Sequence, residues 1–206
     1  MRDWLPVALL AGVGAFTAAA WALGRRAREK KYVALEQLGA ALSLEPLGPR
    51  SFAPTVAGTR DGLGVLVQRV ERRDLFLPAR VDVLLQSRLT LVPAGGVLVR
   101  PGAPPHLEGT AEQRAALEAV LTPAVQEAAA SLGGRFGFRS MDGLLSGSPF
   151  DVLVRLRWPE GWRNMLLRTW LPLDAGADDV RQAIAGLLAV RAALASAPGV
   201  TDLRRG

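Results

Sequence analysis

Cysteine is absent from this chain, and histidine occurs only once, as His106. Without cysteine there is no disulfide, no iron–sulfur cluster, no thiolate-bound zinc and no thiol nucleophile. A single histidine cannot supply a histidine-rich metal site. His106 lies in a stretch rich in proline and glycine, residues 101–109, with no nucleophile or acid near enough in the sequence to form a catalytic set. We therefore interpret it as an exposed, inert residue in a loop.

The common signatures of cofactor binding are also missing. The glycines form neither the G-x-G-x-x-G dinucleotide fingerprint nor a phosphate-binding loop, so we assign them to turns. The acids form no cluster with the spacing of a metal site, and we expect them to be solvated on strands or in turns. The glycines are Gly62, Gly64, Gly143 and Gly147, and the acids are Asp82, Asp142, Asp151 and Glu160. We expect no catalytic, cofactor-binding or metal-binding residue; enzymatic activity stays open, with its absence favoured.

Positive charge is concentrated in one short segment. The net charge is +6, and residues 25–31 (RRAREKK) hold five bases and one acid, which is +4. Residues 1–24 are neutral overall, so only +2 remains for residues 32–206. A nucleic-acid-binding domain needs a basic face on its folded body, and we therefore expect no nucleic-acid partner. The bases are 23 arginines and two lysines, a bias typical of a GC-rich bacterial genome.

Residues 4–24 carry no charge, and they predict a transmembrane anchor over residues 1–24. A helix of this length covers about 30 Å, the thickness of the hydrocarbon core of a bilayer. Indoles favour the membrane interface, and leucine and phenylalanine drive insertion. The predicted anchor residues are Trp4 and Trp21 near the two ends, with Leu9, Leu10, Phe16 and Leu23 between or beside them. Two other interpretations stay open: a cleaved secretory signal and a buried core helix.

The bases that follow the apolar run predict its orientation. Arg25, Arg26, Arg28, Lys30 and Lys31 lie on its C-terminal side, and the positive-inside rule places that side in the cytoplasm. We expect a single-pass protein of the bacterial inner membrane with its N-terminus outside and its body inside. The same bases would meet anionic lipid headgroups, at about 1 kcal/mol per base. Small residues spaced by four, such as Ala8 and Gly12, suggest a homodimer through the anchor.

The rest of the chain predicts an α+β fold, an antiparallel sheet covered by about three helices. Residues 25–43 should form a basic stem helix, residues 44–199 the cytoplasmic domain and residues 200–206 a polar tail. Asp61-Gly62 predicts a hairpin between strands 55–59 and 63–70, and residues 81–91 alternate as one half-buried strand. Thr110 with Gln113 predicts a capping box, and Thr122-Pro123 starts a second helix. Strands followed by a helix recur in 52–132 and 135–197, which suggests two halves.

The last predicted hairpin carries the candidate interaction surface. We expect residues 150–158 to pair with residues 163–171 through a four-residue loop, which gathers the apolar side chains on one face. The opposite face then combines arginine with tryptophan, residue types enriched at binding hot spots. That surface consists of Arg155, Arg157, Trp158, Trp162, Arg168 and Trp170. The alternative is that the helices cover this face and the arginine stems pack along it.

These patterns favour a membrane-anchored protein that presents a non-enzymatic interaction module in the cytoplasm, with a protein partner still to be identified. Two hypotheses compete with it. One is a membrane-tethered enzyme that acts on a lipid or envelope precursor, which a deep pocket lined by perturbed carboxylates or arginines would favour. The other is an exported envelope protein after signal cleavage.

Overall fold

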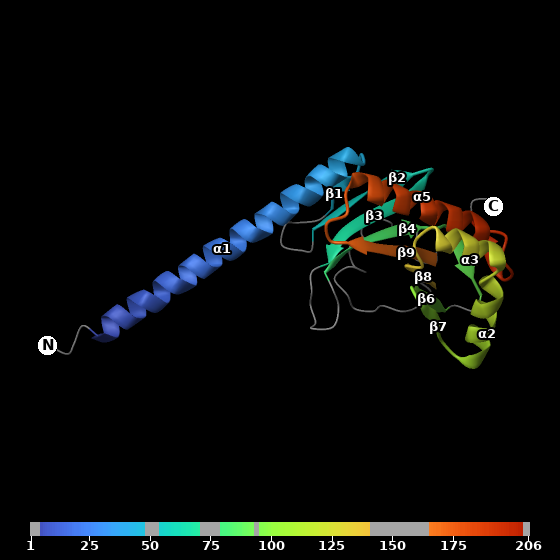
Figure 1. Ribbon diagram of the computed structural model, residues 1–206, viewed down its shortest axis with the longest axis horizontal. Coiled ribbons are helices and arrows are strands. Elements are labelled where there is room, and N and C mark those ends of the chain that lie inside the picture. Colours follow the sequence, from blue (N-terminus) through green and yellow to red (C-terminus); the bar gives the residue numbers. More distant parts are fainter. Residues whose placement is uncertain (1–4, 48–53, 71–78, 93–94, 141–164, 204–206) are drawn as a thin grey trace.

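The computed structural model describes residues 5–47, 54–70, 79–92, 95–140 and 165–203. Its body is α+β, as the sequence predicts, with a large antiparallel sheet and helices packed against it (Figure 1). The described helices are α1 (Leu5–Ala41), α2 (Ala111–Val120), α3 (Pro123–Ala130) and α5 (Ala177–Leu194). The strands of the main sheet are β1 (Glu45–Pro46), β2 (Thr55–Arg60), β3 (Leu63–Val70), β4 (Arg80–Gln86), β6 (Gly96–Arg100), β7 (Ala103–Glu108), β8 (Phe136–Ser140) and β9 (Met165–Pro172). A separate pair joins β5 (Leu89–Leu91) to β10 (Val200–Asp202).

The order of the strands in the main sheet is β1-β2-β3-β4-β9-β8-β6-β7. β9 therefore lies between β4, which pairs with its residues 166–172, and β8, which pairs with its residues 165–169. The hairpin predicted between residues 150–158 and 163–171 is wrong in this respect, because both edges of β9 are already occupied. Residues 150–158 themselves lie outside the described residues. Strands from both suspected halves, residues 52–132 and 135–197, belong to one sheet, in which β9 and β8 lie between β4 and β6.

Local sequence signals set the turns and helix starts. Asp61 and Gly62 both have positive φ, 52° and 72°, which is the backbone of a type I′ turn, and β2 and β3 pair around it. The predicted capping box is confirmed: the Thr110 amide donates to Gln113 Oε1 over 2.7 Å, and the Gln113 amide donates to Thr110 Oγ1 over 3.3 Å. At the start of α3 the Thr122 hydroxyl alone forms the cap, accepting from the Val125 amide over 3.4 Å, and Pro123 lies in the first turn.

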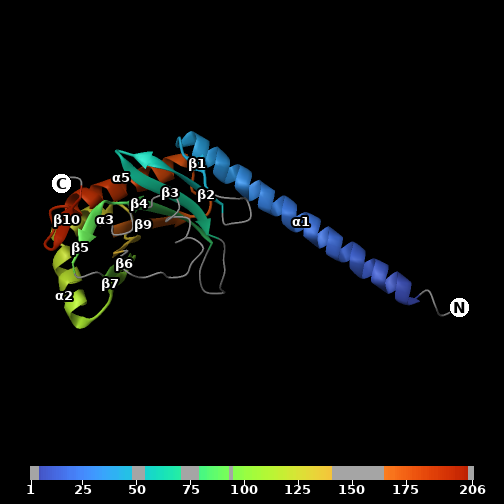
Figure 2. The ribbon, with the colours of Figure 1, turned by 180° about the vertical axis from the view of Figure 1, so that it is seen from behind.

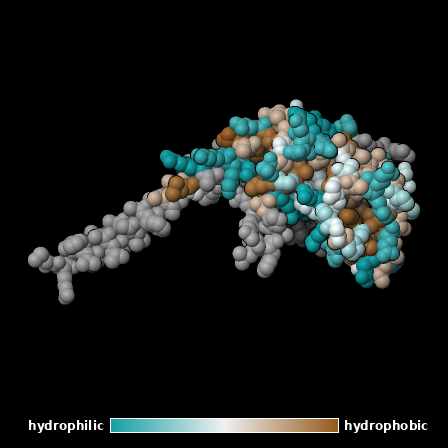
Figure 3. Space-filling view, viewed as in Figure 1, coloured by the Kyte–Doolittle hydropathy of each residue, from teal (hydrophilic) through white to brown (hydrophobic). Residues whose placement is uncertain are grey.

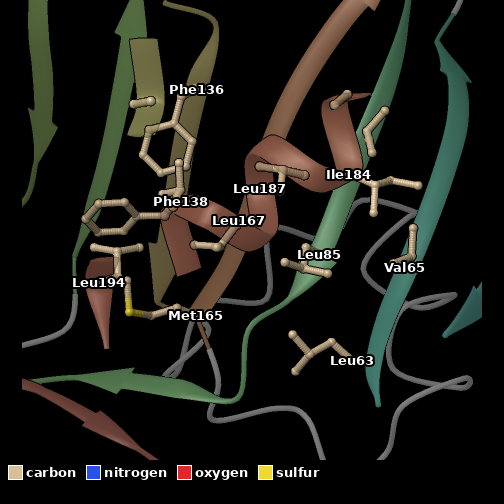
Figure 4. Packing of buried hydrophobic residues seen from close by; sticks show 14 of the residues in the cluster. Leu63, Val65, Leu85, Phe136, Phe138, Met165, Leu167, Ile184, Leu187 and Leu194 are labelled. Carbon is tan, nitrogen blue, oxygen red and sulfur yellow. The ribbon is translucent and has the colours of Figure 1, made fainter. Parts of the chain in front are cut away.

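The core lies between one face of the sheet and the helices. Alternate side chains of the central strands, such as Val83 on β4 and Leu167 on β9, are fully buried there, and α5 lies across these strands (Figure 1). Figure 4 shows Ile184 and Leu187 of α5 among Leu85, Leu167 and the phenylalanines of β8. None of the described helices contributes to the small cluster of Leu66, Leu84, Leu47 and Leu166, which lies on the opposite face. We call that opposite face, defined by Asp82, Leu84, Arg168 and Trp170, the Asp82 face.

Helix α1 is one continuous element of 37 residues. Only its C-terminal end packs on the body, where Leu35 and Leu42 are buried, and the rest stands away from it (Figure 2). The predicted anchor and the predicted stem are thus parts of the same helix. Among the residues that the structure describes, a set without the side chains of residues 5–18, no helix is long and apolar enough to cross a membrane.

The C-terminus of α1 is closed by hydrogen bonds from three directions. Ser43 adopts a positive φ of 54°, and the Leu44 amide donates back to the Gly39 carbonyl over 2.8 Å, which is a Schellman motif. Arg60 of β2 donates to the Leu42 carbonyl, and Arg181 of α5 donates to the Ala41 carbonyl over 2.9 Å. Cationic donors are favourable at this end of a helix because its carbonyls carry partial negative charge.

The strand expected over residues 81–91 is interrupted. β4 ends at Gln86, Arg88 has a positive φ of 53°, and β5 then leaves the main sheet to pair with β10. Buried Ser87 holds this break, since its hydroxyl donates to the Met165 carbonyl and accepts from the Leu89 amide. Strand β10 lies within the segment for which we expected a polar tail.

Residues 101–109 do not form the loop that the prolines suggested. Residues 103–108 form β7, the edge strand of the sheet, which pairs with β6. An edge strand tolerates proline because one side of its backbone needs no partner. His106 lies on β7 and is exposed, as expected.

Candidate functional site

A cavity of about 810 Å³ opens at one end of the sheet, where β4 and β8 begin and β6 and β9 end. This volume is within the range of small-molecule sites, about 300–1,000 Å³. Four arginines line it, one from each of four adjacent strands or their ends. They are Arg80, Arg168, Arg135 and Arg100, in the order of the strands β4, β9, β8 and β6. The apolar part of the lining includes Trp170, Leu98 and Leu173.

The strand register explains why these side chains share one face. Arg168 pairs with Leu84 on one side and with Gly137 on the other, and Gly137 pairs with Leu98. Side chains opposite each other across antiparallel strands point to the same face, so Arg168 and Leu98 both lie on the Asp82 face. One step along, Trp170 pairs with Asp82. Continuation of the β8 register places Arg135 beside Trp170, because Phe136 pairs with Thr169.

Gly137 lies in the middle of this arrangement, at a position with no space for a side chain. A Cβ atom at this position would lie 2.9 Å from the Val97 carbonyl oxygen and 3.3 Å from Leu98 Cδ1, which is closer than van der Waals contact allows. A larger residue would therefore displace the Leu98 side chain that lines the cavity.

Asp82 holds two of the arginines in place. Its Oδ1 accepts from Arg80 Nε and its Oδ2 accepts from Arg168 Nη2, each over 2.8 Å. Asp82 is only 6% exposed, so the sequence prediction of a solvated position is wrong. The alternation of residues 81–85 gave the correct face, but it could not show that this face is covered at Asp82. Charge-assisted bonds of this kind fix both position and orientation of a guanidinium.

Arg168 retains hydrogen-bonding capacity after this contact. Its Nε atom is buried and has no hydrogen-bond partner within the described part of the chain. Burial lowers the pKa of the Arg168 guanidinium below its ordinary value, the charge of Asp82 opposes this effect, and the charge of Arg80 adds to it. A buried donor without an acceptor is unfavourable, so an anion that reached it would gain a charge-assisted hydrogen bond.

Arg100 and Arg135 differ from the other pair because no carboxylate contacts them among the described residues. Arg100 is exposed and Arg135 is half-buried. The backbone of Arg135 is fixed, since the hydroxyl of buried Thr169 donates to its carbonyl. Four guanidinium groups and the single carboxylate of Asp82 leave three excess positive charges at the cavity in the described structure. Asp174, which follows the lining residue Leu173, is exposed and does not line the cavity.

The structure bears on part of the predicted interaction surface. Arg168 and Trp170 both line the cavity, on the face that the described helices leave uncovered. The alternative expectation, that helices cover this face and the arginine stems pack along it, stays a prediction. The remaining members of that surface, Arg155, Arg157, Trp158 and Trp162, lie outside the described residues.

Sequence reasoning missed Arg80, Arg100 and Arg135. Each lies at the first or last position of a strand or just before one, where alternation is weakest. Their one shared signal is that an arginine stands at the same end of three strands, β4, β6 and β8, and that signal is readable only when the order of the strands is known.

The lining residues contain no group suited to proton transfer or nucleophilic attack. The described lining holds arginines, Trp170, aliphatic residues and prolines, without a carboxylate, histidine, serine or lysine. Across the described residues there is also no group of three or more acids or histidines placed to hold a metal ion. The arrangement can bind and orient an anion. No protein-family model, curated protein sequence or solved structure matches this chain.

Proposed function

We propose that the chain is a single-pass membrane protein whose α1 helix anchors a non-enzymatic binding module on the cytoplasmic side of the bacterial inner membrane. The observation that carries the proposal is the position of the uncharged run of residues 4–24. It occupies the end of α1 that stands away from the body, so insertion into a bilayer would not disrupt the core (Figure 1).

The described side chains of α1 support a boundary near Gly24. Trp21 is 63% exposed and Leu23 is 66% exposed, and exposed apolar residues of this size are costly in water. Arg26, Glu29 and Lys30 follow and are exposed as well. Figure 3 shows the same change along the helix, from an apolar stretch to a hydrophilic one. The side chains of Arg25 and Arg28 lie outside the description, and Lys31 is half-buried.

The other end of α1 would hold the body firmly at the membrane. Gly39 packs so closely that a Cβ there would lie 2.8 Å from Val56 Cγ1, and Arg60 and Arg181 bind the last carbonyls. A helix fixed in this way transmits the orientation of the membrane to the sheet. The binding half of the proposal rests on the Asp82 face, which carries the arginine-lined cavity.

A membrane-tethered enzyme for a lipid or envelope precursor is the second candidate, and the arginine-lined cavity favours it to the extent that such precursors are anionic. It would need an acid, base or nucleophile from outside the described lining. An exported protein after signal cleavage is the third candidate. The mass of the mature protein distinguishes it, because cleavage would remove the N-terminal segment. A homodimer through the small residues of the anchor is part of the same proposal.

Membrane extraction of the full chain with a C-terminal tag tests the anchor. We expect the protein to stay in the membrane fraction after alkaline wash, and external protease to leave the body intact in sealed spheroplasts. The double variant Val13→Arg/Phe16→Arg, near the middle of the uncharged run, should move it to the aqueous fraction, because a charge at the centre of a bilayer costs about 2.5–3.5 kcal/mol.

The matched control is Gln37→Arg/Ala40→Arg, which adds the same charge to exposed positions at the body end of the same helix. It should remain in the membrane. Recovery of the unmodified chain in the aqueous fraction, or digestion of its body from outside, would refute the anchor.

A further inference from the structure

We propose that the arginine-lined cavity binds a phosphate ester, a phosphate group joined to an apolar body. This names the ligand of the binding module and therefore rests on the binding half of the proposed function. It does not depend on whether α1 enters a membrane, because every residue involved belongs to the sheet or its ends.

The charge of the cavity selects the anionic group. Among the described residues, Asp82 balances one of the four guanidinium groups, and three positive charges remain. A phosphate monoester carries between −1.5 and −2 at neutral pH, roughly twice the charge of a carboxylate. Its three terminal oxygens can also accept bidentate bonds from more than one arginine, which a carboxylate with two oxygens cannot do as fully.

The hydrogen-bonding state of the arginines points the same way. Arg80 and Arg168 are oriented from behind by Asp82, so their remaining donors are held in place before a ligand arrives. Arg168 Nε is a buried donor without an acceptor in the described structure, and Arg100 and Arg135 have no carboxylate partner there. Preorganised donors of this kind lose little entropy on binding, so they favour the anion more than flexible surface arginines do.

The apolar lining selects the other half of the ligand. Trp170 lies two residues from Arg168 along β9, opposite Asp82, and Leu98 and Leu173 add aliphatic side chains that cannot hydrogen-bond to a phosphate. An indole can instead cover an aromatic or aliphatic group. The cavity volume of about 810 Å³ far exceeds that of an inorganic phosphate ion, which leaves space for an organic body.

Calorimetric titration of the full chain in a neutral detergent tests the inference. The probes are phenyl phosphate, inorganic phosphate and benzoate. We expect saturable binding of phenyl phosphate, with inorganic phosphate weaker by about ten-fold or more because it lacks the apolar body, and benzoate weaker by a similar factor because it lacks the second charge.

Variants separate the two halves of the site. Arg100→Gln and Arg135→Gln should each weaken phenyl phosphate and inorganic phosphate together by about ten-fold or more. Trp170→Leu should weaken only phenyl phosphate and leave inorganic phosphate unchanged. The control Arg114→Gln removes the same charge from an exposed position on α2, outside the cavity, and should change neither affinity.

Nanodiscs with and without phosphatidic acid distinguish a lipid headgroup from a free ester. If phosphatidic acid weakens phenyl phosphate binding, and Arg135→Gln removes that competition, the phosphate comes from a lipid; if it has no effect, the ligand is a free ester. The inference is overturned if phenyl phosphate does not bind, if benzoate binds equally well, or if Arg114→Gln has the same effect as the cavity variants. Membrane extraction tests the anchor in a separate experiment. A protein that stays in the membrane fraction but does not bind phenyl phosphate would therefore refute only this inference.

Discussion

Two buried aspartates each bind arginine in this molecule, and their surroundings differ. Asp202 of β10 accepts from Arg191 Nη2 over 2.6 Å, and Arg191 Nε donates to the Ser87 carbonyl over 3.0 Å. Both side chains of that pair are almost fully buried. Asp82 instead binds two arginines, of which Arg168 keeps a third of its side chain exposed and an unpartnered Nε. The first pair has its donors used within the protein, and the second leaves donors directed at a cavity.

The comparison shows how the same residue types serve structure and binding. Arg191 ties α5 to the break between β4 and β5 and to the last strand, so its bonds replace the strand pairing that the break interrupts. Arg168 joins two strands that are already paired along their length. Its ion pair with Asp82 therefore adds little to the pairing of these strands. Its main consequence is to hold the Arg168 guanidinium in a fixed orientation at the cavity.

The largest effect is expected from Asp202→Ala. It leaves the Arg191 guanidinium buried without its counter-charge, and loss of one partner from a buried pair costs about 3–5 kcal/mol in the free energy of unfolding. Urea denaturation followed by circular dichroism measures it. The control Asp178→Ala breaks an exposed pair with Arg181 on α5 and should leave the midpoint unchanged. A small loss for Asp202→Ala would show that the buried Arg191–Asp202 pair contributes no more to the free energy of unfolding than the exposed Arg181–Asp178 pair.

A smaller loss is expected from Asp82→Asn, about 2 kcal/mol, since the amide still accepts a hydrogen bond while Arg80 and Arg168 lose their shared counter-charge. Added phosphate should raise the melting temperature of this variant more than that of the unmodified chain, because the anion replaces the lost charge. Asp202→Asn should show no such extra rise. Differential scanning calorimetry distinguishes them, and equal phosphate responses would remove the contrast between the two aspartates.

The smallest effect is expected from Arg100→Gln and Arg135→Gln on stability. Both side chains lack a carboxylate partner in the described structure, so their loss should change the free energy of unfolding by no more than about 0.5 kcal/mol. Equilibrium unfolding in urea checks this. A loss comparable to that of Asp202→Ala would mean that these arginines support the fold, and the ligand assay would then have to be repeated with Arg100→Lys and Arg135→Lys.

Local chemistry was sufficient to predict several elements. The Thr110–Gln113 capping box, the Asp61-Gly62 turn and the apolar face of β9 each depend on residues close together in the chain, and each is confirmed. The fold class followed from these pieces. The anchor, its orientation and the partner remain predictions that membrane extraction and binding experiments address.

The errors have a common physical origin, which is contact between residues distant in sequence. Asp82 and Arg168 are 86 residues apart, so the alternation around Asp82 could not show the ion pair that buries it. Pairing of β9 with β4 was missed because the nearest apolar run in the sequence is residues 150–158, which suggested a hairpin. Arg191 and Ser87 are 104 residues apart, and no periodicity in either segment predicts that one holds the other.

The clamp on the C-terminus of α1 has a geometric consequence. Because Gly39 has no space for a side chain and two arginines fix the last carbonyls, the helix cannot turn about its own axis relative to the sheet. Each residue added between Gly24 and Leu35 would rotate the body by about 100° around that axis and lift it by about 1.5 Å. If the far end of the helix is held at a surface, the number of residues in this short stretch determines which side of the sheet faces that surface.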